Sequence, residues 1–148
     1  MEHVKLKVIE DKEEKIQIIK QCDSVFPIRL LERPDSSEIM KKIINYACFY
    51  AAFVSEKDPV GYVAFYANDI KKKIAYISNI GVKLEYQHHH VGSLLMKKSL
   101  EVAKDRGMLM IRLEVLSTNE KAIAFYKHWG FDFELLEGID TYYMSRYL

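Results

Sequence analysis

Apolar residues recur along the chain with two periods, and the changes from one period to the other divide it into strands and helices. Alternating or continuous apolar runs indicate strands, whereas apolar residues three and four positions apart indicate helices. The resulting order is a strand, two helices, three strands, a helix, a strand, a helix and two strands. This order predicts a mixed α/β sheet with antiparallel hairpins on its N-terminal side. The predicted strands are 3–9, 47–55, 60–67, 74–82, 108–116, 131–136 and 140–147.

The predicted helices carry their own start and stop signals. Asp11 can cap the first helix, whose apolar stripe runs through Ile16, Ile19 and Cys22. The serine pair at 36–37 gives a second capping signal just before the second helix. The two later helices each end at a glycine, a residue that commonly stops helices. These two stops are Gly107 and Gly130.

The stretch 74–100 joins an apolar strand to a helix through a polar turn that ends in Gly92-Ser93. The start of a helix has free backbone N–H groups and the positive end of the helix dipole, so it is a general anion site suited to phosphates. The helix that follows has one apolar face. The residues of this face are Leu95, Met96, Ser99, Val102 and Ala103.

Composition narrows the classes of function. Lys and Arg number 22 and Asp and Glu number 21, so the net charge is near zero and nucleic acid is not an expected partner. Cys22 and Cys48 belong to no metal or redox motif and are expected to be reduced, buried thiols. The chain has no leader signal and no apolar run of membrane-spanning length. We therefore expect a cytoplasmic protein with no membrane partner and a single domain, residues 1–148.

Two motifs resemble those of the GNAT superfamily of N-acetyltransferases. The pattern Arg/Gln-x-x-Gly-x-Gly/Ala between a strand and a helix resembles residues 87–92, Gln-His-His-His-Val-Gly. The pattern Asn-x-x-Ala-x-x-Phe/Leu-Tyr-x-x-x-Gly-Phe is similar to residues 119–131. The resemblance implies an α/β (α+β) fold with a mixed, mostly antiparallel central sheet of six to seven strands flanked by about four helices. His90 departs from the family's glycine, so it either crowds the approach of the pyrophosphate or needs a positive φ.

The resemblance implies acetyl-CoA as the co-substrate and no metal. Backbone N–H groups of the turn would hold the pyrophosphate, and backbone groups of Ile80 and Val82 would hold the pantetheine arm. Gly81 is consistent with a bulged or splayed strand that leaves such groups free. The cofactor-binding residues implied in this way are Ile80, Val82, Gln87, His88, His89, His90, Val91, Gly92, Ser93, Asn119, Ala122 and Phe125.

The resemblance also implies a general acid. Tyr126 is seven positions from Asn119 and lies on the same face of one helix, and the matching tyrosine of the family sits near the sulfur of coenzyme A. An ordinary tyrosine pKa of about 10 suits proton donation to a leaving thiolate. The alternative is that Tyr126 is a core aromatic residue beside Phe125 and Trp129.

The sequence defines the general base and the acceptor site less closely. Glu114 is a candidate base on the opposite side of its strand from Leu113 and Val115, and a solvated or salt-bridged carboxylate is the alternative. Tyr76 and Ser78 share one face of the fourth predicted strand and could order a water molecule. Analogy of fold adds candidates for the acceptor pocket. These are Phe26, Arg29 and Glu32.

The run His88-His89-His90 suggests either a metal site or a phosphate site. Neighbouring side chains point in different directions, so three adjacent histidines do not easily converge on one metal ion. The alternative is that one or two of them lie near the pyrophosphate, whose charge favours the imidazolium form.

These observations together predict an acetyl-CoA-dependent N-acetyltransferase that moves an acetyl group directly to a primary amine of a small molecule or peptide. The alternatives are a non-catalytic acyl-CoA-binding sensor on the same fold and a structural interaction module. Amino sugars, polyamines, aminoglycosides, amino acids and protein N-termini all stay open as acceptors. The resemblance is compatible with a homodimer, which no residue of the chain indicates by itself.

Overall fold

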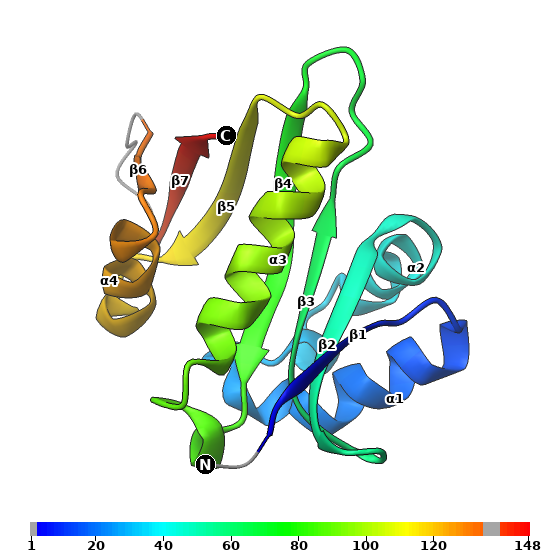
Figure 1. The fold of residues 1–148 in the computed structure, drawn as a ribbon. Coiled ribbons are helices and arrows are strands. Elements are labelled where there is room, and N and C mark those ends of the chain that lie inside the picture. The colour runs from blue at the N-terminus through cyan, green and yellow to red at the C-terminus, as the bar shows by residue number, and fades with distance from the viewer. Residues whose placement is uncertain (1–2, 135–139) are drawn as a thin grey trace.

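The computed structural model describes residues 3–134 and 140–148, which form a seven-stranded sheet with four α-helices (Figure 1). The strands are Lys5–Val8 (β1), Cys48–Ser55 (β2), Asp58–Tyr66 (β3), Ile74–Val82 (β4), Met110–Leu116 (β5), Asp132–Phe133 (β6) and Thr141–Tyr147 (β7). The α-helices are Lys12–Cys22 (α1), Ser36–Tyr46 (α2), Val91–Asp105 (α3) and Glu120–His128 (α4). Short 3₁₀ helices span Asp23–Val25 (η1), Leu30–Glu32 (η2) and Leu84–Tyr86 (η3).

The strand order is β1-β2-β3-β4-β5-β7-β6. Among the strands of the described residues, only β4 and β5 are parallel neighbours, and the five other neighbouring pairs are antiparallel. The predicted mixed, mostly antiparallel sheet flanked by four helices is therefore confirmed. The parallel pair lies in the middle of the sheet, and the turn between β4 and α3 begins the long connection between its two strands.

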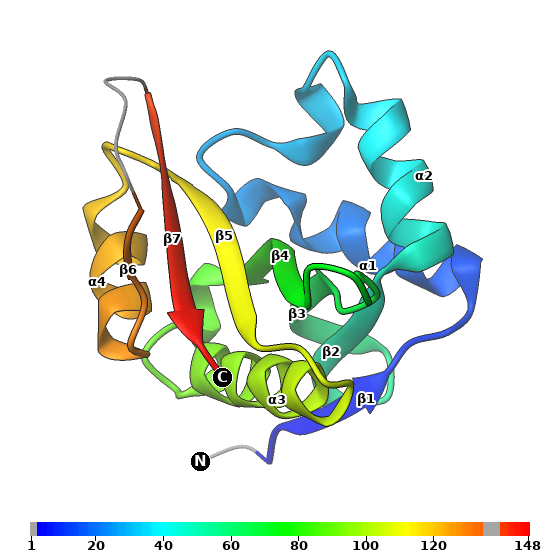
Figure 2. The same cartoon turned by 90° about the horizontal axis from the view of Figure 1, so that it is seen from above.

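Helices cover both faces of the sheet, but not evenly. α3 and α4 lie on one face, whereas α1 and α2 lie on the other face over β2 and β3 and leave β5 and β7 without a helix (Figures 1 and 2). β3 is buried on both sides, because Val63 and Phe65 join the α3 core while Tyr62 and Ala64 join the α1 core. Within the described ranges, no helix is both long and apolar enough to cross a membrane.

The first helix starts as predicted but buries a different face. The carboxylate of Asp11 accepts a hydrogen bond from the backbone N–H of Glu14 at 2.9 Å, which confirms the cap. Ile16 is only half-buried, and Lys15 is buried in the neighbouring position. Its ammonium donates to the carbonyl of Ile44, near the C-terminal end of α2, at 3.1 Å. This hydrogen bond lets a lysine stem occupy the interface between α1 and α2.

Several other predicted boundaries are wrong by a few residues. α2 begins at Ser36 itself, preceded by Asp35 without a side-chain cap, because the Asp35 carboxylate lies 3.3 Å from Nε of Arg33 instead. β5 begins at Met110 rather than at 108. β6 spans only two residues of the predicted strand 131–136. Leu136 and the predicted turn at Glu137-Gly138 lie outside the described residues.

Residues 23–35, here called the strap, connect α1 to α2 and pass over the uncovered part of the sheet (Figure 2). Asp23 is buried, and its two carboxylate oxygens accept backbone hydrogen bonds from Leu30 at 2.9 Å and Leu31 at 3.1 Å. Both bonds reach the first residues of η2, whose N–H groups would otherwise lack partners. One buried carboxylate therefore holds the two ends of a nine-residue loop together.

We expect Asp23→Ala to lower the free energy of unfolding by about 3 kcal/mol, because it leaves buried N–H groups without acceptors. Asp11→Ala is the matched control, since it removes one exposed carboxylate–amide bond and should cost only about 1 kcal/mol. Urea unfolding of both variants measures the difference. Equal losses would show that Asp23 does not hold the strap.

Candidate active site

The site begins at a bulge in β4. The β3–β4 register pairs Phe65 with Ile77 but Ala64 with Asn79, so Ser78 is an extra residue on β4. Before the bulge Ala75 and Ile77 face the α3 core, and after it Ile80 and Val82 contact that core. The irregularity that the sequence suggested is present, but it lies at Ser78 rather than at Gly81.

Just beyond the bulge, β4 and β5 separate. Among the described residues their pairing runs from Ile74–Met110 to Ile77–Leu113 and stops there. The β3–β4 pairing continues to Val82, and the β5–β7 pairing continues to Leu116. The edge of β4 that faces β5 therefore has no strand partner from Ser78 to Val82. Backbone N–H and C=O groups on such an edge are strong hydrogen-bonding groups that an extended ligand can pair with.

A cavity of about 980 Å³ fills the gap between the two strands. It reaches α3 and α4 on one side of the sheet and the strap on the other. On the helix side it is lined by Gln87, His88, His90, Val91, Gly92, Ser93, Asn119, Lys121, Ala122, Phe125 and Tyr126. On the strap side it is lined by Val25, Phe26, Pro27, Ile28, Leu30, Arg33, Pro34, Asp35, Glu114 and Thr141. Between them lie Ser78–Val82 and Val115–Leu116.

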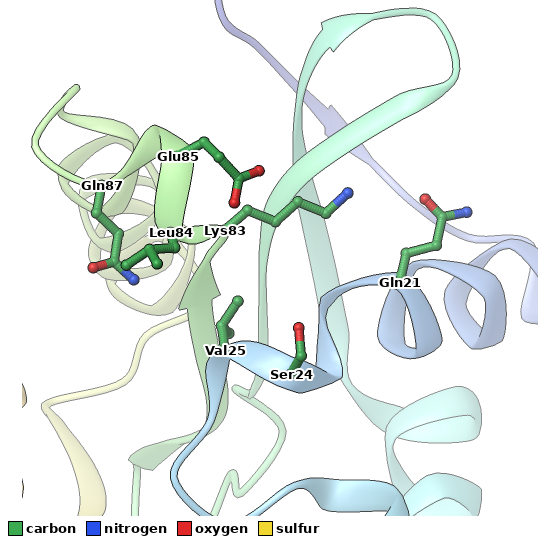
Figure 3. A pocket seen from close by; sticks show the side chains of 7 residues that line it. All are labelled: Gln21, Ser24, Val25, Lys83, Leu84, Glu85 and Gln87. Atoms are coloured by element: carbon green, nitrogen blue, oxygen red, sulfur yellow. The ribbon is translucent and has the colours of Figure 1, made fainter.

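A smaller hollow of about 500 Å³ adjoins this cavity and shares Val25 and Gln87 with it (Figure 3). Figure 3 shows that its walls come from the end of α1, from η1 and from the turn after β4. Gln87 also connects the turn to its surroundings, because its amide nitrogen donates to the carbonyl of Val82 at 3.0 Å and its amide oxygen accepts from Lys121 at 2.7 Å.

The helix side of the cavity carries groups that can hold an anion. The first residues of α3, from Val91 to Ser93, have backbone N–H groups that precede the first helical hydrogen bond, which Leu94 donates to His90. His90 stands before them with φ +63°, so it takes the left-handed conformation that its departure from glycine required. His88, His90 and Lys121 add basic side chains to this end of the cavity.

Tyr126 lies on α4 as the motif predicted, and Asn119 immediately precedes this helix. The Asn119 side chain caps α4 by accepting from the N–H of Ala122 at 3.3 Å. Tyr126 packs against Phe125 and Phe131, with ring centroids 5.7 and 5.9 Å away. Burial raises the pKa of Tyr126 to about 12, above the ordinary value that the sequence suggested. The phenol is therefore a neutral hydrogen-bond donor at physiological pH.

The strap side carries the candidate base. Glu114 is exposed on the opposite side of β5 from the buried Leu113 and Val115, as predicted. One of its oxygens accepts a hydrogen bond from the hydroxyl of Thr141 at 2.9 Å. Ser78 also lines the cavity, and its hydroxyl donates to the side chain of Asn79 at 2.9 Å.

Gly81 lets the strap pack directly on β4. A Cβ atom at this position would lie 2.7 Å from a methyl group of Val25 and 2.8 Å from the ring of Phe26. The Phe26 ring also meets Tyr62 edge-on, with centroids 6.1 Å apart. Phe26 is thereby fixed as a wall of the cavity on the strap side.

Four residues predicted for the site lie outside the cavity lining. Tyr76 precedes the bulge, at the level where β4 still pairs with β5, and burial raises its pKa to about 12. Arg29 is exposed, and its Nη1 lies 3.5 Å from Oε1 of Glu32. Glu32 is also outside the lining. His89 lies near the ring of Tyr86, at 6.5 Å between centroids.

Other lining residues gave no recognisable signal in the sequence. Arg33, Asp35 and Thr141 come from segments far apart in the chain, and only the sheet register and the strap bring them to one place. Pro27 cannot continue a helix, which is a local sign that the strap differs from the helix before it. Across residues 3–134 and 140–148, no three His, Cys, Asp or Glu side chains are grouped so as to hold a metal ion.

A model of the acetyltransferase (GNAT) family matches residues 17–131. Thialysine N-epsilon-acetyltransferase of Bos taurus is 40% identical over 73 residues, which are 48% of this chain and 43% of that protein. An uncharacterised N-acetyltransferase of Methanocaldococcus jannaschii is 38% identical over 88 residues, which are 57% of this chain and 38% of that protein. The chain thus spans less than half the length of these curated relatives.

Solved structures share the fold over nearly the whole chain. PaiA N-acetyltransferase of Thermoplasma acidophilum, in complex with coenzyme A, has a TM-score of 0.75 at 21% identity, with 99% of each chain covered. The ribosomal-protein-S18-alanine N-acetyltransferase of Escherichia coli has a TM-score of 0.72 at 17% identity, with 98% of this chain and 94% of that chain covered. At these identities the likeness shows a common fold.

We expect the free energy of unfolding of His90→Gly to be unchanged or higher by up to about 1 kcal/mol, because glycine adopts the left-handed conformation without strain. His89→Gly is the matched control in the same turn, where φ is not positive and a glycine should cost about 0.5–1 kcal/mol. Thermal or urea unfolding without ligand compares the two variants. A loss for His90→Gly as large as that for His89→Gly would mean that the positive φ costs nothing.

Proposed function

Because the chain belongs to the acetyltransferase (GNAT) family, we propose that it transfers an acetyl group from acetyl-CoA directly to a primary amine of a small molecule or peptide. The separation of β4 from β5 is the observation that carries this proposal. It opens a cavity through the sheet that has basic groups and a helix N-terminus on one side and the carboxylate of Glu114 on the other. An anionic co-substrate and an amine acceptor can therefore enter from opposite sides.

The residues present fit coenzyme A. The free edge of β4 from Ser78 to Val82 offers backbone groups to the amide groups of the pantetheine arm. The N–H groups at the start of α3 suit the pyrophosphate, and His88, His90 and Lys121 add positive or hydrogen-bonding groups beside it. A Cβ atom on Gly92 would lie 3.4 Å from the ring of Phe125, an ordinary van der Waals contact, so α4 lies close beside the start of α3.

The transfer forms an amide and releases a thiol. The amine nitrogen attacks the acyl carbon, the carbon–sulfur bond breaks, the amine loses a proton and the sulfur gains one. Acetyl-CoA supplies the activated acyl group and the leaving sulfur. Tyr126 would donate the proton to the sulfur, since burial maintains its phenol in the protonated state.

Glu114 would receive the proton of the amine, either directly or through a water molecule. Its exposed carboxylate lies on the strap side of the cavity, and the hydrogen bond from Thr141 orients it. Direct transfer is favoured over a covalent enzyme intermediate because no cysteine is among the described residues that line the cavity. Burial raises the pKa of Cys22 to about 11 and also raises that of Cys48, which makes both thiols weak nucleophiles.

Tyr126→Phe should lower kcat by at least about 100-fold while the dissociation constant for coenzyme A changes by less than about twofold. The hydroxyl acts only as sulfur leaves, so its loss affects turnover rather than binding. Tyr142→Phe is the matched control, because Tyr142 packs against Phe133 outside the cavity. Thiol release and calorimetric titration with coenzyme A measure the two quantities.

The pH profile of the unmodified protein gives a second measurement on the same residue. Since the pKa of Tyr126 is about 12, its phenol stays protonated through pH 10, and kcat should show no alkaline decline below that pH from this group. Unchanged turnover in Tyr126→Phe would remove the tyrosine from the mechanism. Tight binding of coenzyme A without transfer to any amine would instead indicate a binding protein.

A further inference from the structure

The strap gives the acceptor side of the cavity an apolar wall. Phe26, Pro27, Ile28, Leu30 and Pro34 all line the cavity. Ile28 lines the cavity, and 56% of the surface of this residue is exposed. Burial of an aliphatic side chain is favourable, so a ligand that covers Ile28 would be stabilised. An acceptor with an apolar group next to its amine would cover this surface.

The wall is held in place before any acceptor arrives. Asp23 ties the two ends of the loop through Leu30 and Leu31, and Phe26 is fixed between Gly81 and Tyr62. A preformed surface binds a complementary group without first having to be ordered. The strap can therefore select acceptors rather than simply adapt to them.

The charges on this side are nearly all paired. Nε of Arg33 lies 3.3 Å from a carboxylate oxygen of Asp35. Arg112 lies just outside the lining, with its Nε 2.7 Å from a carboxylate oxygen of Glu134 and its guanidinium against the ring of Tyr143. Glu114 is the exception, because no salt bridge to it occurs in the described part of the chain. Among its described lining residues, this side therefore offers one carboxylate for an ammonium group and no unpaired cation for a carboxylate or phosphate.

We propose that the acceptor is a primary amine whose neighbouring group is apolar and uncharged. This inference rests on the proposed function, and it names the class of acceptor. The ammonium meets Glu114, which takes its proton, and the apolar group lies against Ile28 and Phe26. The neutral nitrogen then attacks the acyl carbon as the carbon–sulfur bond breaks. Tyr126 gives a proton to the sulfur, and the second proton that the nitrogen loses returns to Tyr126 through solvent. A free amine with an aliphatic chain and a peptide with an apolar first residue share this chemistry.

Four acceptors of matched structure test the two requirements. Leucinamide satisfies both, glycinamide lacks the apolar group, leucine adds a carboxylate, and a short peptide with an N-terminal leucine extends the chain. We expect kcat/KM for leucinamide to exceed the values for glycinamide and leucine by at least about tenfold. The ratio of the peptide to leucinamide then distinguishes a polypeptide acceptor from a small one.

Two variants connect the preference to the strap. Ile28→Ser should reduce the advantage of leucinamide over glycinamide about three- to tenfold and leave KM for acetyl-CoA unchanged. Ile70→Ser is the matched control, because Ile70 is 80% exposed and lies outside the cavity. Asp35→Asn frees Arg33 from its ion pair and should narrow the advantage of leucinamide over leucine severalfold.

The outcomes separate this inference from the proposed function. If kcat/KM for glycinamide or leucine equals that for leucinamide, the proposed acceptor class is wrong but the proposed acetyltransferase activity is retained. If Ile28→Ser and Ile70→Ser behave alike, the strap does not select the acceptor, and the inference is overturned. Failure to bind coenzyme A and to acetylate any acceptor would overturn the proposed function as well.

Discussion

The separation of β4 from β5 beyond Ile77 and Leu113 is the constraint on which the rest of the site depends. A strand edge inside a sheet normally finds its partner in the neighbouring strand, because unpaired backbone groups are costly. Here the bulge at Ser78 and the end of the parallel pairing expose five residues of β4 to a cavity instead. The cost of leaving these backbone groups unpaired is compensated only when a ligand supplies the hydrogen bonds that β5 would otherwise make. The gap is therefore suited to binding a ligand.

The surrounding elements have roles that follow from this gap. α3 begins at the end of the gap between β4 and β5, and its first N–H groups are free at that end. α4 closes one side of the gap with Phe125 and Tyr126. The strap closes the other side, where α1 and α2 leave the sheet without a helix (Figure 2). Gly81 and Asp23 hold the strap there, one by removing a side chain from β4 and the other by binding both ends of the loop. In the proposed function, the helix side of this cavity receives the phosphates and the strap side receives the amine.

Local signals in the sequence were sufficient for much of the fold. Asp11 capped its helix, Gly107 and Gly130 took the positive φ of helix stops, and the motif at 119–131 placed Tyr126 in the cavity. Features set by contacts between distant segments were not predictable. Lys15 is buried only because α2 ends beside it, the bulge depends on the register with β3, and the raised pKa of Tyr126 depends on its packing. Arg33, Asp35 and Thr141 reach the cavity through the same long-range assembly.

Amide hydrogen exchange with and without saturating coenzyme A tests the central claim most directly. Ligand binding to the open edge of β4 should slow exchange in residues 78–82 and in residues 90–93 at the start of α3, because their N–H groups gain acceptors. Exchange in β1, at the far edge of the sheet, should not change. Binding of coenzyme A that leaves exchange in residues 78–82 unchanged would contradict the account.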